Sequence, residues 1–182
     1  MILIPILLLI AILGFYLWNL SRSLKKAQVQ IRAAFIQVDL ELQKRNSRIP
    51  EFIEISKKAL AQERPLLESL VHKRNEASAA LQIATVNPFD QEIMSSLCLK
   101  EKEFQKVLTL FLNLLSTQEK LLTQPKLIEL LQAEKNSQDQ IRTTIESYHQ
   151  SISPYNRAQE PFPASVLSSF LGFHKAPLLS VS

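Results

Sequence analysis

The sequence predicts an all-α protein: an N-terminal transmembrane helix, an up-and-down antiparallel four-helix bundle and a short C-terminal amphipathic helix. Three observations predict this fold. The first twenty residues carry no charged side chain, apolar residues then recur at helical spacing in four successive segments, and the 182 residues include only two glycines. Tight hairpins and phosphate-binding loops depend on glycine. The composition therefore favours helices and excludes a nucleotide-binding loop of the Walker or dinucleotide type.

Residues 2–20 form the predicted membrane anchor, through which lipid is the first expected partner. A helix of this length spans roughly 28 Å, close to the hydrocarbon thickness of a bilayer. Tyr16 and Trp18 stand at its end, where amphipathic rings prefer the headgroup level. A cleaved signal peptide and a buried soluble helix are the alternatives. No basic residue precedes the run, and residues 16–21 offer no A-x-A cleavage pattern, which favours a retained anchor.

The charges beside the anchor predict its orientation. Arg22, Lys25 and Lys26 follow the apolar run closely, and no Lys or Arg comes before it. Basic flanks stay on the cytoplasmic side of a membrane. We expect a single-pass cell-membrane protein with its N-terminus outside and its bundle in the cytoplasm. Cys98 is the only cysteine, which agrees with a compartment that does not form disulfides.

Four apolar stripes, spaced alternately by four and three residues, predict the bundle over residues 21–160. They cover residues 24–42, 49–81, 93–121 and 127–155, and the first is expected to continue the anchor helix. The expected breaks lie at Asn46–Pro50, at Asn87–Asp90 with Asn87 as the helix cap, and before Pro125. Pro65 is predicted to kink the second helix, and Pro154 to bend or end the fourth.

Polar residues interrupt each stripe, Glu134 among them. A di-iron site in a bundle takes a pair of Glu-x-x-His motifs on facing helices, which this chain does not supply. We therefore interpret these residues as polar contacts that set the register of the helices. The net charge is +4, and residues 21–48 hold seven basic and two acidic residues. Because the rest of the chain is close to neutral, no nucleic-acid partner is predicted.

Residues 161–182 form a C-terminal segment with a short amphipathic helix. Phe162 and Pro163 begin this helix, and Gly172 is expected to stop it. Val166, Leu167, Phe170 and Leu171 fall on one side. We expect this helix to pack back on the bundle, because its polar side lacks the cations of an interfacial helix. Contact with the membrane interface is the alternative.

Two signatures give the chain a family resemblance. The first runs from Ala34 to Arg45, with Gln37 and Asp39, and is followed by Ile49-Pro50. The second is Tyr148-His149 and, seven residues on, Tyr155-Asn156, followed by Phe162-Pro163 and Gly172-Phe173. Together they resemble the LemA family, which often has Asn where this chain has His149. The resemblance implies a membrane-anchored helical bundle and no particular reaction.

The paired aromatic residues have a structural interpretation as well. Tyr148 and Tyr155 are seven apart and share one helix face, where we expect core packing with the hydroxyls at the rim. Asn156 is expected to cap the end of the helix.

The function predicted from the sequence is a membrane-tethered scaffold or adaptor that binds an unidentified protein. The alternative is a small-ligand or lipid binder with Tyr148, Tyr155 and Phe162 as the walls of a cleft. We do not expect an enzyme, because no nucleophile motif or histidine cluster is found in the sequence. No catalytic residue, metal ligand or cofactor is predicted, and the oligomeric state stays open.

Overall fold

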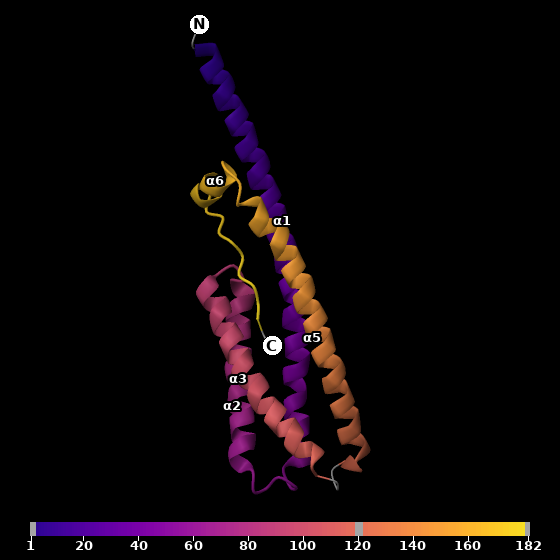
Figure 1. Cartoon of the computed structure of the whole chain (residues 1–182). Coiled ribbons are helices and arrows are strands. Elements are labelled where there is room, and N and C mark those ends of the chain that lie inside the picture. The colour runs from indigo at the N-terminus through magenta and orange to yellow at the C-terminus, as the bar shows by residue number, and fades with distance from the viewer. Residues whose placement is uncertain (1–2, 119–121, 181–182) are drawn as a thin grey trace.

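The computed structural model describes residues 3–118 and 122–180, and its regular elements there are helices joined by short loops (Figure 1). Ile2 and Leu121, which begin the predicted anchor and end the third predicted stripe, lie outside these residues, as do residues 181–182. The all-α prediction is confirmed. The helices are α1 (Leu3–Ser56), α2 (Arg64–Val86), α3 (Gln91–Ser116), α5 (Pro125–Ala158) and α6 (Ala164–Phe170).

Helix α1 is a single helix of 54 residues whose N-terminal part stands clear of the bundle (Figure 1). Among the described helices it is the one long and apolar enough to cross a membrane; its best window has a mean hydropathy of 1.6 and is not buried against other elements. The same helix then enters the bundle without a break. The predicted continuity of the apolar run with the first bundle helix is thus observed.

The bundle consists of two antiparallel helix pairs, α1 with α5 and α2 with α3 (Figure 1). Its apolar core has two parts. The anchor-side cluster includes Phe35 and Tyr148, with ring centroids 5.5 Å apart. The distal cluster includes Phe52 and Phe111, whose rings meet edge-on at 6.2 Å.

The predicted helix break at Asn46–Pro50 is wrong, because α1 continues through Pro50 to Ser56. Proline cannot donate a backbone hydrogen bond, so the carbonyl of Asn46, four residues earlier, loses its helical partner. Arg74 of α2 supplies one: its Nη1 donates to the Asn46 carbonyl at 3.4 Å. Ile49 and Phe52 on either side of the proline are fully buried, which further holds this turn in place.

The true break lies at residues 57–63, so the second predicted stripe is shared between α1 and α2. The prediction that Pro65 kinks a helix is wrong. Pro65 stands within the first two positions of α2, where its missing N–H costs nothing. The predicted start of α5 at Pro125 is confirmed, and α5 continues through Pro154 to Ala158.

Helix α3 begins close to where the sequence predicts, but its cap is Asp90 and not Asn87. The Asp90 carboxylate accepts hydrogen bonds from the backbone N–H groups of Glu92 and Ile93, at 2.9 and 3.0 Å. A carboxylate satisfies the free N–H groups at a helix start and also complements the helix dipole.

Helix α6 ends near Gly172 as predicted, but it does not pack through its apolar side. Ala164 and Ser168 are the buried residues of α6, whereas Val166 and Phe170 are exposed. The predicted packing of this helix against the bundle is observed in its contact with α1, but it uses Ala164 and Ser168 and not the apolar side.

Candidate functional site

The C-terminal tail, residues 173–180, runs back into the bundle in an extended conformation after α6 (Figure 1). Gly172 makes the reversal possible, since its φ of 77° is readily adopted only by glycine. Phe173, Ala176 and Leu179 are buried in the anchor-side cluster. Every third tail residue is thus part of the core, and the tail completes the bundle.

Tyr155 and Asn156 on α5 hold the first half of this tail. The Tyr155 hydroxyl donates to the carbonyl of His174 at 3.0 Å and accepts from Gln28 Nε2 of α1 at 3.1 Å. The Asn156 side chain forms two hydrogen bonds with the backbone of Ala176: Nδ2 donates to its carbonyl at 2.9 Å, and Oδ1 accepts from its N–H at 2.8 Å. The prediction that Asn156 caps the helix is wrong, because its amide is used on the tail.

Tyr148 and His149 hold the second half of the tail through hydrogen bonds of the same kind. The Tyr148 hydroxyl donates to the carbonyl of Pro177 at 3.3 Å. The Nε2 atom of His149 lies 2.9 Å from the carbonyl oxygen of Leu179 and 3.2 Å from its nitrogen. A neutral imidazole makes one of these two bonds in each tautomer, whereas the Asn156 amide makes both of its bonds at once.

The two sets of hydrogen bonds lie in register because seven residues of helix and three residues of extended tail cover nearly the same length. Seven residues of α-helix rise about 10.5 Å, and three residues of extended chain cover about 9–10 Å. Tyr148 and His149 are seven residues before Tyr155 and Asn156 on α5. They bond backbone groups three residues further along the tail than those that Tyr155 and Asn156 bond. We call Tyr148, His149, Tyr155 and Asn156 the tail clamp.

Burial keeps both clamp phenols neutral. Desolvation raises the pKa of Tyr148 above its ordinary value, and it raises the pKa of Tyr155 as well. Both hydroxyls therefore stay protonated and can donate to the tail. Phe162 is exposed, so the described side chains of Tyr148, Tyr155 and Phe162 do not wall a common cleft; the tail fills the place beside the tyrosines.

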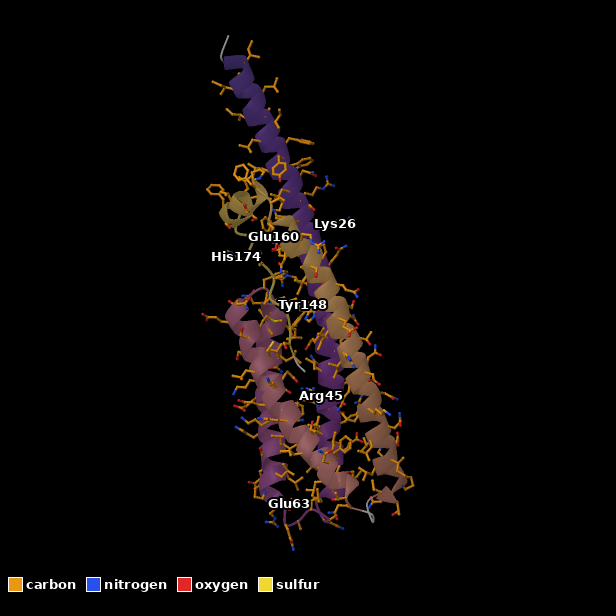
Figure 2. The ribbon with its side chains drawn as sticks, in the orientation of Figure 1. Lys26, Arg45, Glu63, Tyr148, Glu160 and His174 are labelled. Atoms are coloured by element: carbon orange, nitrogen blue, oxygen red, sulfur yellow. The ribbon has the colours of Figure 1, made fainter. Side chains whose placement is uncertain are left out.

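A layer of buried polar side chains separates the two core clusters, formed by Arg45, Asn46, Glu101, Glu134 and Ser137. Figure 2 shows Arg45 between the two helix pairs, below Tyr148. Arg45 forms an ion pair with Glu101 of α3 at 2.5 Å, and its guanidinium lies 4.7 Å from the centre of the Phe104 ring. Asn46 accepts from Arg45 Nη2 at 3.1 Å and donates to Ser78 Oγ of α2. The layer thus ties α1 to α2 and α3.

Glu134 of α5 also belongs to this polar layer, but its carboxylate has fewer close partners than that of Glu101. Its carboxylate lies 3.6 Å from Arg48 Nη1, but neither oxygen has a hydrogen-bond partner among the described protein atoms. Desolvation raises the pKa of Glu134, and the nearby charges of Arg45 and Arg48, together with the Gln138 side chain, offset this only in part. The Glu134 carboxyl is therefore more easily protonated in the fold than in water.

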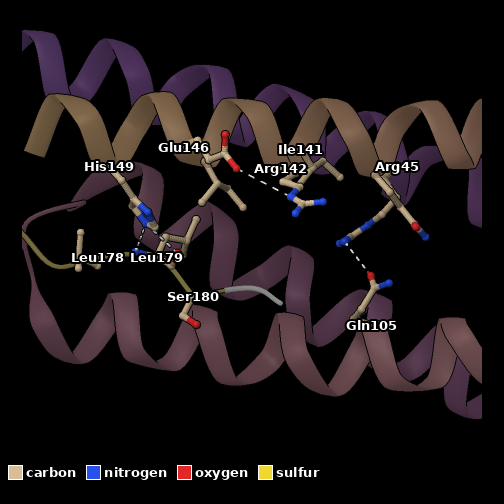
Figure 3. Close-up of a pocket in the computed structure, with 11 residues that line it drawn as sticks. Arg45, Gln105, Ile141, Arg142, Glu146, His149, Leu178, Leu179 and Ser180 are labelled. Carbon is tan, nitrogen blue, oxygen red and sulfur yellow. Dashed lines mark hydrogen bonds and ion pairs between the residues drawn. The ribbon is translucent and has the colours of Figure 1, made fainter.

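A cavity of about 790 Å³ opens where the tail reaches this polar layer (Figure 3). Arg45 lies at one end, where its Nη1 is 3.5 Å from Gln105 Oε1, and His149 lies at the other, beside Leu179. Ile141 and Leu178 add apolar wall. A cavity of this size, with a few convergent polar groups, has the dimensions of a small-ligand site. Glu146 and His149 on its rim are one Glu-x-x-His spacing, yet the described residues contain no group of three or more His, Cys, Asp or Glu side chains able to hold a metal ion.

The remaining sequence-predicted residues lie apart from this cavity. Gln37 and Pro50 are exposed on α1, and Asp39 is buried and accepts from Gln43 at 2.7 Å. Phe173 is buried in the core, and Pro163, after a cis peptide bond, precedes α6. The residues beside the apolar run are exposed on α1: Tyr16, Trp18, Arg22, Lys25 and Lys26.

The family model for LemA matches residues 34–182. The chain belongs to the LemA family. No curated protein matches it. The LemA match contains the tail clamp, the polar layer and the tail, and the apolar run lies before its first residue. The LemA signature residues Tyr148, Tyr155 and Asn156 therefore have a visible structural role in this chain, which is to dock its own tail.

Sequence reasoning missed Glu101, the partner of Arg45 in this LemA bundle. The available signal was weak: Glu101 is one of several charged residues in a helical stretch, and it lies outside the stripe expected for that helix. Only the packing of α3 against α1 shows that its side chain is fully buried.

Proposed function

We propose that this protein is a single-pass membrane protein whose helical bundle acts as a scaffold or adaptor for another protein at the cytoplasmic face. The observation that carries the proposal is the uninterrupted course of α1 from the apolar run into the bundle core. A continuous helix transmits position and orientation, whereas a flexible linker would not. Such a helix suits a protein that presents a surface at a defined height above a bilayer.

The residues at the end of the apolar run support a retained anchor. Trp18 is exposed, and the guanidinium of Arg22 lies 5.7 Å from the centre of its ring. Lys25 and Lys26 are exposed one turn further on. An aromatic residue followed by cations is typical of the boundary between hydrocarbon and cytoplasm.

An exposed apolar stripe on α1 is the surface we propose for the partner. Val29, Ile36 and Leu40 recur at spacings of seven and four, so they lie on one side of the helix, and all three are exposed. The other bundle helices leave this stripe exposed. In the proposed orientation the stripe lies close to the membrane. An amphipathic helix of a partner would bury it in the manner of a two-helix seam.

Site-specific photocrosslinking in living cells tests the adaptor proposal. The full chain carries a photoreactive phenylalanine analogue at Ile36, and the matched control carries it at Leu110 on α3, which is also apolar and exposed. We expect a discrete adduct with one other protein from position 36 and none from position 110. Equal adducts from both positions, or an adduct with a second copy of this chain alone, would contradict an adaptor role.

Cysteine labelling tests the orientation independently. Cys98 is replaced by Ser, and single cysteines are placed at the exposed positions Lys26 and Lys106. An impermeant maleimide should label both positions only after the cells are opened. Labelling in intact cells would place the bundle outside and refute the cytoplasmic assignment.

The cavity beside Arg45 favours a second candidate function, the binding of a small ligand. Native mass spectrometry of the full chain released from mild detergent should then show a bound small molecule. Ile141→Trp places a larger side chain in the cavity and should abolish the binding of this molecule. A spectrum of the wild-type protein without added mass would leave the scaffold as the supported function.

A further inference from the structure

Helix α6 presents its apolar residues to the outside. Its buried residues are Ala164 and Ser168, whereas Phe162, Val166 and Phe170 are 86%, 61% and 87% exposed. A surface helix normally buries its apolar stripe and exposes its polar one. The opposite arrangement at three neighbouring positions, two of them phenylalanine, indicates that an apolar environment lies outside the chain on this side.

The position of α6 identifies that environment. Tyr155 of α5 is level with Gln28 of α1, and α5 ends one turn later, so α6 lies on the anchor side of this level, in contact with α1. In Figure 1, α6 is seen almost end-on while α1 runs along the picture, which means that α6 lies across the direction of the apolar run. A helix at the inner end of a membrane span, lying across it, has the placement of an interfacial helix.

Cations around this position complement an anionic lipid surface. The polar side of α6 holds serines and no cation, but α1 carries exposed Arg22, Lys25 and Lys26 close to the same level. Lys175, in the tail after α6, is also exposed, but its ammonium is paired with the Glu160 carboxylate at 3.2 Å. Basic residues near a membrane surface attract anionic headgroups. The charges that α6 itself lacks are thus supplied by its neighbours.

We propose that Phe162 and α6 form a second membrane contact. In this contact Phe162, Val166 and Phe170 insert at the headgroup boundary of the leaflet that faces the bundle. The proposal rests on α1 being the membrane anchor. One helix through a bilayer leaves the bundle free to rotate about that helix. A second contact beside it fixes which side of the bundle faces the membrane, and the tail clamp connects α6 to the core.

Quenching of tryptophan fluorescence by brominated lipid tests the proposal on the full chain. The protein has one tryptophan, Trp18, which reports on the anchor. Two reporters of the α6 contact combine Trp18→Phe with Phe170→Trp or with Phe162→Trp, both at exposed positions where the fold does not depend on the side chain. The matched control combines Trp18→Phe with Leu110→Trp, exposed on α3. All are reconstituted in vesicles of phosphatidylcholine and phosphatidylglycerol with acyl-chain bromine.

We expect strong quenching at positions 18, 162 and 170, and at least a threefold weaker effect at position 110. If Trp18 is quenched while both α6 reporters behave like the Leu110→Trp control, the anchor stands and the α6 contact is refuted. If Trp18 itself is not quenched, the anchor and with it the proposed function fail. A blue-shifted but unquenched emission at position 170 would show that protein, such as a second copy of the chain, covers this surface instead of lipid.

Discussion

Arg45 of α1 and Glu101 of α3 form an ion pair in the interior of the bundle, with side chains that are 2% and 0% exposed. They lie 56 positions apart in the sequence. Arg45 is held further by Asn46, Gln105 and the face of Phe104. Because the ion pair joins the two helix pairs at one level, it fixes the register in which α1/α5 and α2/α3 meet.

Removing one partner of this pair should destabilise the fold strongly. Glu101→Ala leaves the Arg45 charge buried without its partner, which costs about 3–5 kcal/mol of unfolding free energy. Urea unfolding of the full chain in mild detergent, followed by circular dichroism, measures the loss. The control is Glu54→Ala, which breaks an exposed pair with Lys57 and should cost under about 1 kcal/mol.

A double replacement separates stability from register. Arg45→Met with Glu101→Leu removes both charges, and apolar substitution of a buried pair is often neutral or stabilising. We expect the double variant to recover most of the stability lost in Glu101→Ala. A loss as large as that of the single variant would show that the other partners of Arg45, and not the charge pair, hold this level of the bundle.

The tail clamp yields a second prediction. Asn156→Ala removes two hydrogen bonds to the Ala176 backbone, together about 2 kcal/mol, so amide exchange in the tail should accelerate about 30-fold. Asn136→Ala is the matched control on the same helix, since the side-chain hydrogen bond of Asn136 among the described residues is with the exposed Gln132. Unchanged exchange in Asn156→Ala would mean that buried Phe173 and Leu179 suffice to hold the tail.

The histidine in the clamp can be tested against the family residue. His149→Ala should release Leu179, whereas His149→Asn should hold it at least as well as wild type, because an amide donates and accepts at once. The same exchange measurement, made at Leu179 and Ser180, distinguishes the two variants. Equal release in both would show that Asn cannot reach the tail from this position.

Glu134 gives the fold a pH dependence of predictable sign. Burial raises its pKa in the folded state, so between its unfolded pKa, about 4.5, and the higher folded value the folded protein binds more protons than the unfolded one. The contribution of Glu134 to stability therefore falls as pH rises through this window. Glu134→Gln removes this effect, and its unfolding free energy relative to wild type should increase as pH rises from about 4.5 to 7.

Two outcomes discriminate the cause. Glu129→Gln, an exposed position on α5, should show no such trend. If the advantage of Glu134→Gln shrinks as pH rises, attraction to Arg48 outweighs burial, and Glu134 is held charged in the fold.

Local patterns predicted much of this fold because they are fixed by neighbouring residues. The charge-free run, the stripes and the starts of α3 and α5 depend on residues within one or two turns. The break at Pro50 was wrong because its outcome depends on Arg74, which comes from another helix. The tail clamp was missed for the same reason: the role of Asn156 becomes visible only when Ala176 is placed beside it. Partners distant in sequence decided both cases.

A surface network between α2 and α3 provides the last prediction. Glu76 accepts from Lys73 at 2.7 Å and from Lys100 at 3.0 Å, and these hydrogen bonds lower its pKa to about 2. A depressed carboxyl pKa stabilises the fold above the unfolded value, about 4.5, and this stability is lost as pH falls towards 2. Glu76→Gln should therefore be less stable than wild type at pH 6, and the difference should shrink steadily below pH 4.5.

Salt provides the independent check on that network, because its charges are near the surface. At roughly 1 M salt the screening length falls to about 3 Å, and the difference between Glu76→Gln and wild type should become smaller at pH 6. Glu146→Gln, which loses only an exposed contact with Arg142, should show little dependence on either pH or salt. A Glu76 effect that persists in high salt would mean that the hydrogen bonds from Lys73 and Lys100, and not the charges, hold α2 against α3.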